Sequence, residues 1–220
     1  MPILRVNGQL DISQFWPGGE SDGDTAKVLV TNQSFEVDLK ETGKFVKTHV
    51  FENATAKGRT TTQVIKKGKL TIRFQGIDAP ELHYKAAPLP RTASATQRTK
   101  YNAANNNFRQ NFGQSSAFAL GQLLAKSGKG IINCQVVTNV DTPNEVFDTY
   151  GRFIGDILVT IGGKQVDLNL WMVENGWAFP TFYNSMTEEE IKSFLQASKK
   201  GRPLVLGKFL TYRCLSLSFY

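Results

Sequence analysis

The sequence has little of what disulfide scaffolds and structural zinc sites require. Its 220 residues include two cysteines, Cys134 and Cys214, and two histidines, and their spacing matches no zinc-binding pattern. Cys134 alternates with Ile132 and Val136, which predicts a core position in a strand. We therefore expect neither a disulfide framework nor a zinc site.

Long apolar runs are also missing. No stretch approaches the roughly 20 apolar residues of a membrane span, so we expect no membrane-embedded segment. The opening residues, MPILRVNGQLDIS, lack the basic and apolar regions of a signal peptide. The compartment stays unknown, because an exported chain can lose its leader or use another route.

Acidic residues are outnumbered by basic ones. Lysine and arginine total 26 against 19 aspartate and glutamate residues, which gives a net charge of +7 and a pI near 9.4. This balance favours an anionic partner, with nucleic acid first and an acidic membrane surface second. Charge alone leaves open a basic soluble protein with no such partner. The length suits one sizeable core.

The most informative stretch is TIRFQGIDAPE, residues 71–81. Apolar and polar residues alternate over 70–74, which predicts a strand with one buried face and places Arg73 opposite the core. A glycine and a proline then end the strand, beside Asp78 and Glu81. Two carboxylates and a guanidinium are costly to group unless a cation or a phosphate joins them. This strand end therefore predicts a functional site.

Two shorter motifs look like partners of this strand end. SDGDT carries Asp22 and Asp24 and precedes an apolar strand, and TYGRF carries Tyr150 and Arg152 and begins the strand Phe153–Ile161. Alone, the first motif would more often be a turn, and the arginine would more often be a surface ion-pair partner. Together with the arginine strand, they predict one shared site.

In this order, DGDT, GIDAPE and YGR resemble the motifs of the staphylococcal (micrococcal) nuclease family, the thermonucleases. The resemblance implies an α+β fold: a five-stranded barrel of the oligonucleotide-binding (OB) type with about three helices around it. It covers roughly residues 22–183. We accordingly expect an N-terminal segment at 1–21, the nuclease-like domain at 22–183, and a C-terminal helix and tail at 184–220.

Two stretches of that domain are not covered by the resemblance. Residues 32–69 read as a β-hairpin insertion, with Phe35–Leu39 and Phe45–Phe51 as its strands. Residues 82–114 are rich in Pro, Ser, Thr and Asn and contain no acidic residue, which predicts mostly loop. Because this segment leaves the site strand directly, it either tracks a phosphate backbone or is a passive loop.

Other elements are expected from local signals. Helices should begin near Ser115, at a cap formed by Asp167, and at a capping box formed by Thr187 and Glu190. A short strand is expected at Ile3–Val6. The tail of the chain stays unassigned.

The resemblance implies a metal site. In the family one Ca²⁺ ion is bound by the residues that match Asp24 and Asp78 and by a backbone carbonyl, here that of Ala79. Mg²⁺ is the less expected ion, although the same oxygen donors suit both. Many relatives have threonine at the position of Ala79, and alanine keeps the carbonyl. Asp22 and Thr25 look like partners that orient these ligands.

The resemblance also implies catalytic and binding roles. Glu81 matches the glutamate that orients or deprotonates the attacking water. Arg73 and Arg152 match the pair that grips the scissile phosphate, a task that suits the planar fork of arginine. Tyr150 and Tyr183 resemble residues that line the nucleotide pocket. His83 has no matching role in the family.

The expected function is a Ca²⁺-dependent nuclease that hydrolyses phosphodiester bonds of DNA and RNA, with single strands preferred. Base specificity should be low, because the matching residues address phosphate. The alternative is a non-catalytic OB-fold module that binds nucleic acid, although such modules typically lack the carboxylates or arginines retained here. A protein-interaction role for the tail is compatible with either. A monomer is the default expectation, and endo- or exonuclease preference stays open.

Overall fold

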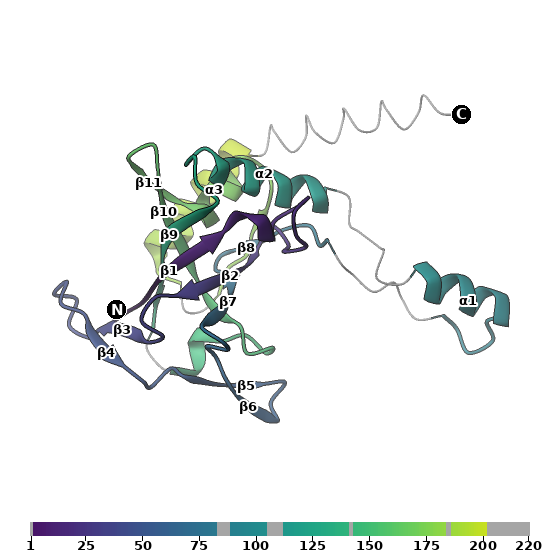
Figure 1. The fold of residues 1–220 in the computed structure, drawn as a ribbon, viewed down its shortest axis with the longest axis horizontal. Coiled ribbons are helices and arrows are strands. Elements are labelled where there is room, and N and C mark those ends of the chain that lie inside the picture. The colour runs from purple at the N-terminus through teal and green to yellow at the C-terminus, as the bar shows by residue number, and fades with distance from the viewer. Residues whose placement is uncertain (1, 83–88, 105–111, 141–142, 184–185, 202–220) are drawn as a thin grey trace.

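The computed structural model describes residues 2–82, 89–104, 112–140, 143–183 and 186–201. Its centre is a closed, mixed β-barrel (Figure 1). The five barrel strands are β1 (Ile3–Asp11), β2 (Thr25–Val30), β7 (Lys69–Phe74), β9 (Ile131–Asn139) and β10 (Phe153–Ile161).

The barrel closes through one parallel contact. β1 pairs antiparallel with β2 on one side and with β9 on the other. β2 pairs with β7, and β9 pairs with β10, again antiparallel. The ring is completed where β7 and β10 run in parallel, with Arg73 opposite Ile154. This confirms the five-stranded, OB-type α+β barrel that the sequence predicts.

Alternating side chains fill the barrel. Along β7, Leu70, Ile72 and Phe74 are fully buried, and removing such alternate apolar faces from water is the main driving force for closing the barrel. Cys134 lies in the same core as a free thiol, as predicted. The strand expected at Ile3–Val6 is longer, because the alternation continues to Asp11. Segment 1–21 thus contributes a full strand to the barrel.

The insertion at 32–69 contains two hairpins where one was predicted. The predicted hairpin is present, and its first strand also pairs with β1 and so extends the barrel sheet. The second hairpin was missed, because its threonine-rich strands carry few apolar residues. The four strands are β3 (Phe35–Asp38), β4 (Val46–Thr48), β5 (Asn53–Ala56) and β6 (Thr60–Gln63).

The segment at 82–114 contains a helix that was not predicted, α1 (Ala95–Ala104). The Gln97 N–H donates to Ser94 Oγ at 3.2 Å, and the Ser94 N–H donates to Gln97 Oε1 at 2.8 Å. This reciprocal capping box was a readable signal for a helix start. Figure 1 shows α1 standing apart from the barrel. His83 lies outside the described residues, as does the tail after residue 201.

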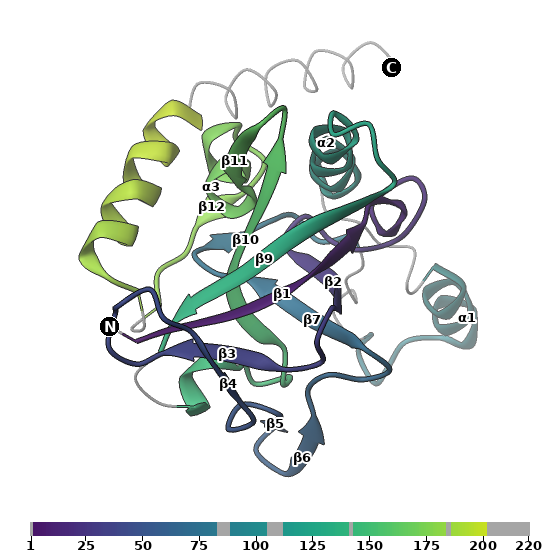
Figure 2. The same cartoon turned by 60° about the vertical axis from the view of Figure 1, so that its left-hand side comes forward.

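Three further helices bring the total in the described residues to four rather than about three. They are α2 (Gly113–Ala125), α3 (Leu168–Glu174) and the helical residues 188–201. Figure 2 shows them on one side of the barrel, away from the hairpins. None of the described helices has the length and apolar character of a transmembrane span.

The predicted helix caps of this layer are confirmed. Asp167 accepts hydrogen bonds from the N–H groups that open α3, at 2.9 and 3.1 Å. Thr187 and Glu190 form the expected reciprocal bonds, with the Glu190 N–H donating to Thr187 Oγ1 at 3.2 Å. The remaining short elements are η1 (Ile12–Gln14), β8 (Ile77–Asp78), η2 (Pro143–Val146), β11 (Lys164–Asp167) and β12 (Phe179–Pro180).

Candidate active site

The guanidinium of Arg73 lies between two carboxylates at the end of β7. Its Nη2 is 2.9 Å from Asp78 Oδ1, and its Nη1 forms an ion pair with Asp24. The Asp24 side chain is 4% exposed and that of Arg73 is 12% exposed, whereas the Asp78 side chain is 62% exposed. Arg73 therefore joins a buried carboxylate from the start of β2 to an exposed one on β8.

The backbone at Gly23, next to Asp24, lies very close to α2 and to Ala79. A Cβ added at Gly23 would lie 2.2 Å from Ser116 Oγ on α2 and 3.1 Å from the Ala79 Cβ. Only glycine leaves room for this approach, which explains the glycine between the two aspartates of the DGD motif. The motif is therefore held against α2 and the segment after β8.

Asp24 is buried within a set of donors. The Ala79 N–H donates to its Oδ2 at 2.9 Å, and Thr25 Oγ1 donates to its Oδ1 at 3.1 Å. Burial raises the pKa of Asp24, while the Arg73 guanidinium and the two hydrogen bonds oppose that rise. The charged form of Asp24 thus depends on Arg73 and on the Ala79 backbone.

Glu81 and Asp22 form an acidic pair beside this centre. Burial raises the pKa of Glu81 to about 7, with further contributions from the negative charges of Asp22 and Asp24. Asp22 Oδ1 also accepts the Leu82 N–H at 2.6 Å, which fixes the backbone that carries Glu81. A carboxyl group that titrates near neutral pH can both give and take a proton there.

Arg152 belongs to a second group, at the start of β10. Its Nε lies 2.6 Å from Asp148 Oδ2, and its Nη1 donates to Thr25 Oγ1 at 3.2 Å. Asp148 Oδ1 accepts the N–H groups of Tyr150 and Arg152 at 2.9 and 2.8 Å. Thr25 thus links this loop to Asp24. Asp148 was missed from the sequence, although an aspartate three residues before a glycine is a common turn signal.

Each tyrosine expected at the site accompanies one arginine. Tyr150 is 64% exposed, and its ring centroid lies 5.6 Å from Arg152 Cζ. Tyr183 is partly buried and packs against the core. It follows β12, which pairs with β8, the strand that carries Asp78. Burial lowers the pKa of Arg73, but Asp24 and, to a smaller extent, Tyr183 more than offset this and raise it.

The residues present fit a hard cation that takes only part of its ligands from the protein. Among the described residues, no three Asp, Glu, His or Cys side chains form a group that could hold a metal. The carboxylates of Asp24 and Asp78 nevertheless meet at one cationic group, the Arg73 guanidinium. Carboxylate and carbonyl oxygens completed by water are the donors that Ca²⁺ and Mg²⁺ prefer.

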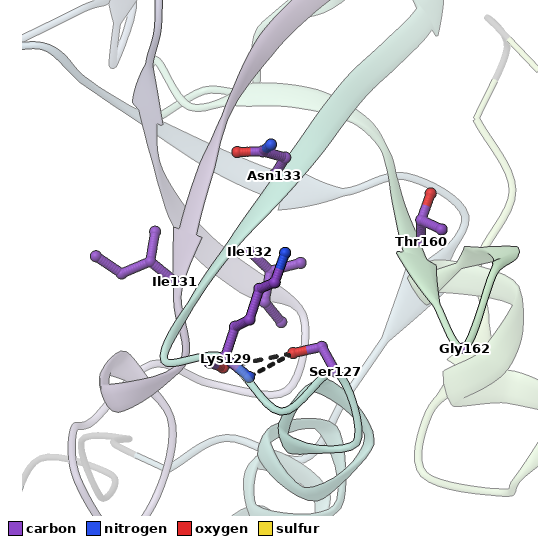
Figure 3. Close-up of a pocket in the computed structure, with 7 residues that line it drawn as sticks. All are labelled: Ser127, Lys129, Ile131, Ile132, Asn133, Thr160 and Gly162. Carbon is purple, nitrogen blue, oxygen red and sulfur yellow. Dashed lines mark hydrogen bonds between the residues drawn. The ribbon is translucent and has the colours of Figure 1, made fainter.

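One hollow lies away from the candidate site and another adjoins it. The first, at the far end of β10 from Arg152, has a volume of about 320 Å³ and lies between Lys129 and Thr160 (Figure 3). None of the residues expected at the site lines it. The other, of about 460 Å³, adjoins the site. It is lined by Gln14, Gly19, Glu20, Ser21, Asp22, Thr25 and Lys27.

A family comparison bears on this geometry. A family model described as staphylococcal nuclease homologue matches residues 71–207. The matched region includes Arg73, Asp78 and Arg152, whereas Asp24 precedes it. No curated protein matches the chain. The ion pair between Arg73 and Asp24 connects the matched region to the motif that lies outside it.

Proposed function

The chain belongs to the staphylococcal nuclease family, and from this premise we propose that it hydrolyses phosphodiester bonds of DNA and RNA with the help of one Ca²⁺ ion. The observation that carries the proposal is the Arg73 guanidinium held between Asp24 and Asp78. Such a group of charges has a chemical purpose when a cation and a phosphate are to be bound together.

Arg73 and Arg152 are proposed to grip the scissile phosphate. Each is already oriented by a carboxylate, Arg152 by Asp148 and Arg73 by Asp24 and Asp78. Less side-chain freedom is then lost when a phosphate binds. Arginine suits this role because it stays charged and can donate two parallel hydrogen bonds to phosphoryl oxygens.

The ion would be held by the carboxylates of Asp24 and Asp78 and by the Ala79 carbonyl. When bound, it would supply positive charge to the phosphoryl oxygens and lower the pKa of a coordinated water. Thr25 would orient the Asp24 carboxylate through its hydroxyl. Asp22 would hold the backbone that follows Ala79 through its bond to the Leu82 N–H.

Glu81 is proposed to orient the attacking water or accept its proton. Its pKa of about 7 means that it can bind and release a proton near neutral pH, which is the condition for effective general-base help. Burial and the two neighbouring aspartates together produce this property, so the role depends on the surroundings of Glu81 as much as on its position.

The substrate we propose is single-stranded or frayed nucleic acid of any sequence. Exposed Tyr150 offers a face on which an unpaired base can stack, and Tyr183 is proposed to line the nucleotide pocket. The arginines address phosphate, so base specificity should be low. We propose that the functional unit is the domain at 22–183, to which β1 adds one strand.

The test is digestion of denatured DNA in Ca²⁺, which should stop when a chelator is added. Glu81→Gln should lower the rate by about 10²–10⁴-fold and leave oligonucleotide binding unchanged. Glu189→Gln, the same change on an exposed helical residue, is the control and should have no effect. Salt-dependent binding without cleavage under any divalent ion would instead identify a non-catalytic binding module.

A further inference from the structure

The second inserted hairpin, β5–β6, is docked on the loop that begins β10 (Figures 1 and 2). The Lys57 N–H donates to the Thr149 carbonyl at 2.5 Å. A Cβ added at Gly151 would lie 3.4 Å from the Ala56 Cβ, which is van der Waals contact. Ala54 is 3% exposed and belongs to the core. A backbone hydrogen bond and close packing therefore fix the hairpin against this loop.

The tip of this hairpin carries two exposed cations. Lys57 and Gly58 have φ values of 54° and 67°, and the Arg59 N–H donates to the Ala56 carbonyl at 3.3 Å. These features define a tight hairpin turn, in which Lys57, Gly58 and Arg59 connect the paired residues Ala56 and Thr60. Lys57 and Arg59 are both exposed, and neither forms a salt bridge within the part of the chain that the structure describes. Their charge is therefore available to a partner.

Lys57 also faces the candidate active site. Its Nζ lies 6.0 Å from the centroid of the Tyr150 ring, and Arg152 Cζ lies 5.6 Å from the same centroid. A cation–π contact of this length at an exposed site is weak, so it does not by itself account for placing a second cation there. The charge of Arg152 is balanced by Asp148, whereas the charge of Lys57 is not balanced by a carboxylate within the described residues.

We propose that Lys57 and Arg59 bind the phosphate backbone of a single-stranded polynucleotide where it passes beyond the phosphate held by the two site arginines. This inference rests on the proposed function and deepens it, because it adds a contact that only a longer substrate can make. The Tyr150 ring is close to both the site arginine and Lys57, so a base stacked on it would lie near both cations. The insertion thereby favours long substrates over dinucleotides.

The test measures binding apart from cleavage. The unaltered 220-residue chain and the variant Lys57→Gln/Arg59→Gln are titrated, in a chelator, with a fluorescently labelled oligothymidylate 12-mer at several salt concentrations. For a single strand, each lost phosphate contact lowers the salt slope by about 0.7, so the double variant should lose about 1.4. Lys57→Arg should keep the slope of the unaltered chain.

The matched control is Lys40→Gln/Lys44→Gln, which also removes two charges, at exposed positions in the turn of the other inserted hairpin. It should leave the slope unchanged. In Ca²⁺, the double variant should raise KM for the 12-mer, with kcat and the KM for a dinucleotide unaffected. Both variants should keep the thermal transition of the unaltered chain, since the replaced side chains are exposed.

The two proposals fail in different ways. If the unaltered chain digests DNA but the double variant binds the 12-mer with an unchanged slope, the hairpin inference is overturned and the nuclease proposal stands. If the unaltered chain binds without cleaving and the double variant loses slope, the nuclease proposal fails. The hairpin then remains a nucleic-acid contact.

Discussion

The two arginines of the candidate site sit in opposite surroundings. Arg73 is 12% exposed and pairs with a buried aspartate 49 positions away, so its ion pair joins β2 to β7. Arg152 is 31% exposed and pairs with an aspartate only four positions away, inside one loop. Removing a charge from the first setting affects the barrel, whereas removing it from the second affects one loop. Burial thus gives Arg73 a structural role that Arg152 lacks.

The largest effect is expected from replacing Arg73, which tests the comparison of the two arginines directly. Arg73→Ala leaves Asp24 buried without its cation, and at pH 8 without metal it should lower the free energy of unfolding by about 3 kcal/mol. Arg152→Ala should lower it by less than about 1 kcal/mol. Denaturant unfolding measures both. Equal losses would contradict the comparison, and Arg73→Ala/Asp24→Asn should recover part of the loss, because it removes the unpaired charge.

Two other buried carboxyl groups, which have no ion-pair partner among the described residues, can be compared with Asp24. Asp167 caps α3. Asp156 accepts a hydrogen bond from Asn169 Nδ2 of the same helix at 2.7 Å. Burial raises the pKa of Asp156 well above its ordinary range, and Asp167 adds to the rise. Burial also raises the pKa of Asp167 to about 6, opposed by its helix-capping bonds and assisted by Glu190. The pKa of Asp24 is raised by burial as well, but there the Arg73 guanidinium opposes the rise, whereas no cation in the described part of the chain opposes it at Asp156 and Asp167.

These raised pKa values predict that the free energy of unfolding decreases as the pH rises. The folded chain holds the proton of Asp167 more tightly than the unfolded chain does, so the stabilisation is complete below about pH 4 and is lost as pH rises through about 6. In Asp167→Asn the asparagine can still cap α3. The decrease in the free energy of unfolding between pH 4 and 8 should then be smaller by about 2 kcal/mol. Denaturant unfolding between pH 4 and 8 measures it. A slope unchanged by Asp167→Asn would contradict the assignment, and Glu189→Gln serves as the unaffected control.

The barrel could be predicted because its signals are local. Alternating burial along 70–74 is encoded in neighbouring residues, as are the caps at Asp167 and Thr187. The missed hairpin β5–β6 carries threonines in place of an apolar stripe, since only Ala54 faces the core. Its pairing depends on contacts with distant parts of the chain that local periodicity does not contain.

The candidate site was predictable to a similar degree. Two motifs named Asp24, Asp78 and Arg73, which the structure brings together at one end of the barrel. The position of Lys57 beside Tyr150 could not be read from the sequence, because it joins residues 93 positions apart. Asp148 was different, because its signal was present in the turn and was overlooked.

The smallest expected effect concerns the loop that holds Arg152. Gly151 has a φ of +76°, where a Cβ costs about 1 kcal/mol, so Gly151→Ala should lower the free energy of unfolding by about that amount. The added Cβ would lie at ordinary contact distance from Ala56, 3.4 Å, so when the strained backbone of the loop relaxes the hairpin should move with it, and oligonucleotide binding should weaken about fivefold.

The control for this variant is Gly43→Ala. Gly43 has a φ of +75°, and no atom lies within 4 Å of an added Cβ, so the backbone strain is the same without the contact. It should lose similar stability, measured by denaturant unfolding, and keep full affinity for the 12-mer. If both variants bind equally well, the loop tolerates the change, and the setting of Arg152 does not depend on its packing against the hairpin. If only Gly151→Ala binds weakly, local packing holds Arg152 in place much as burial holds Arg73.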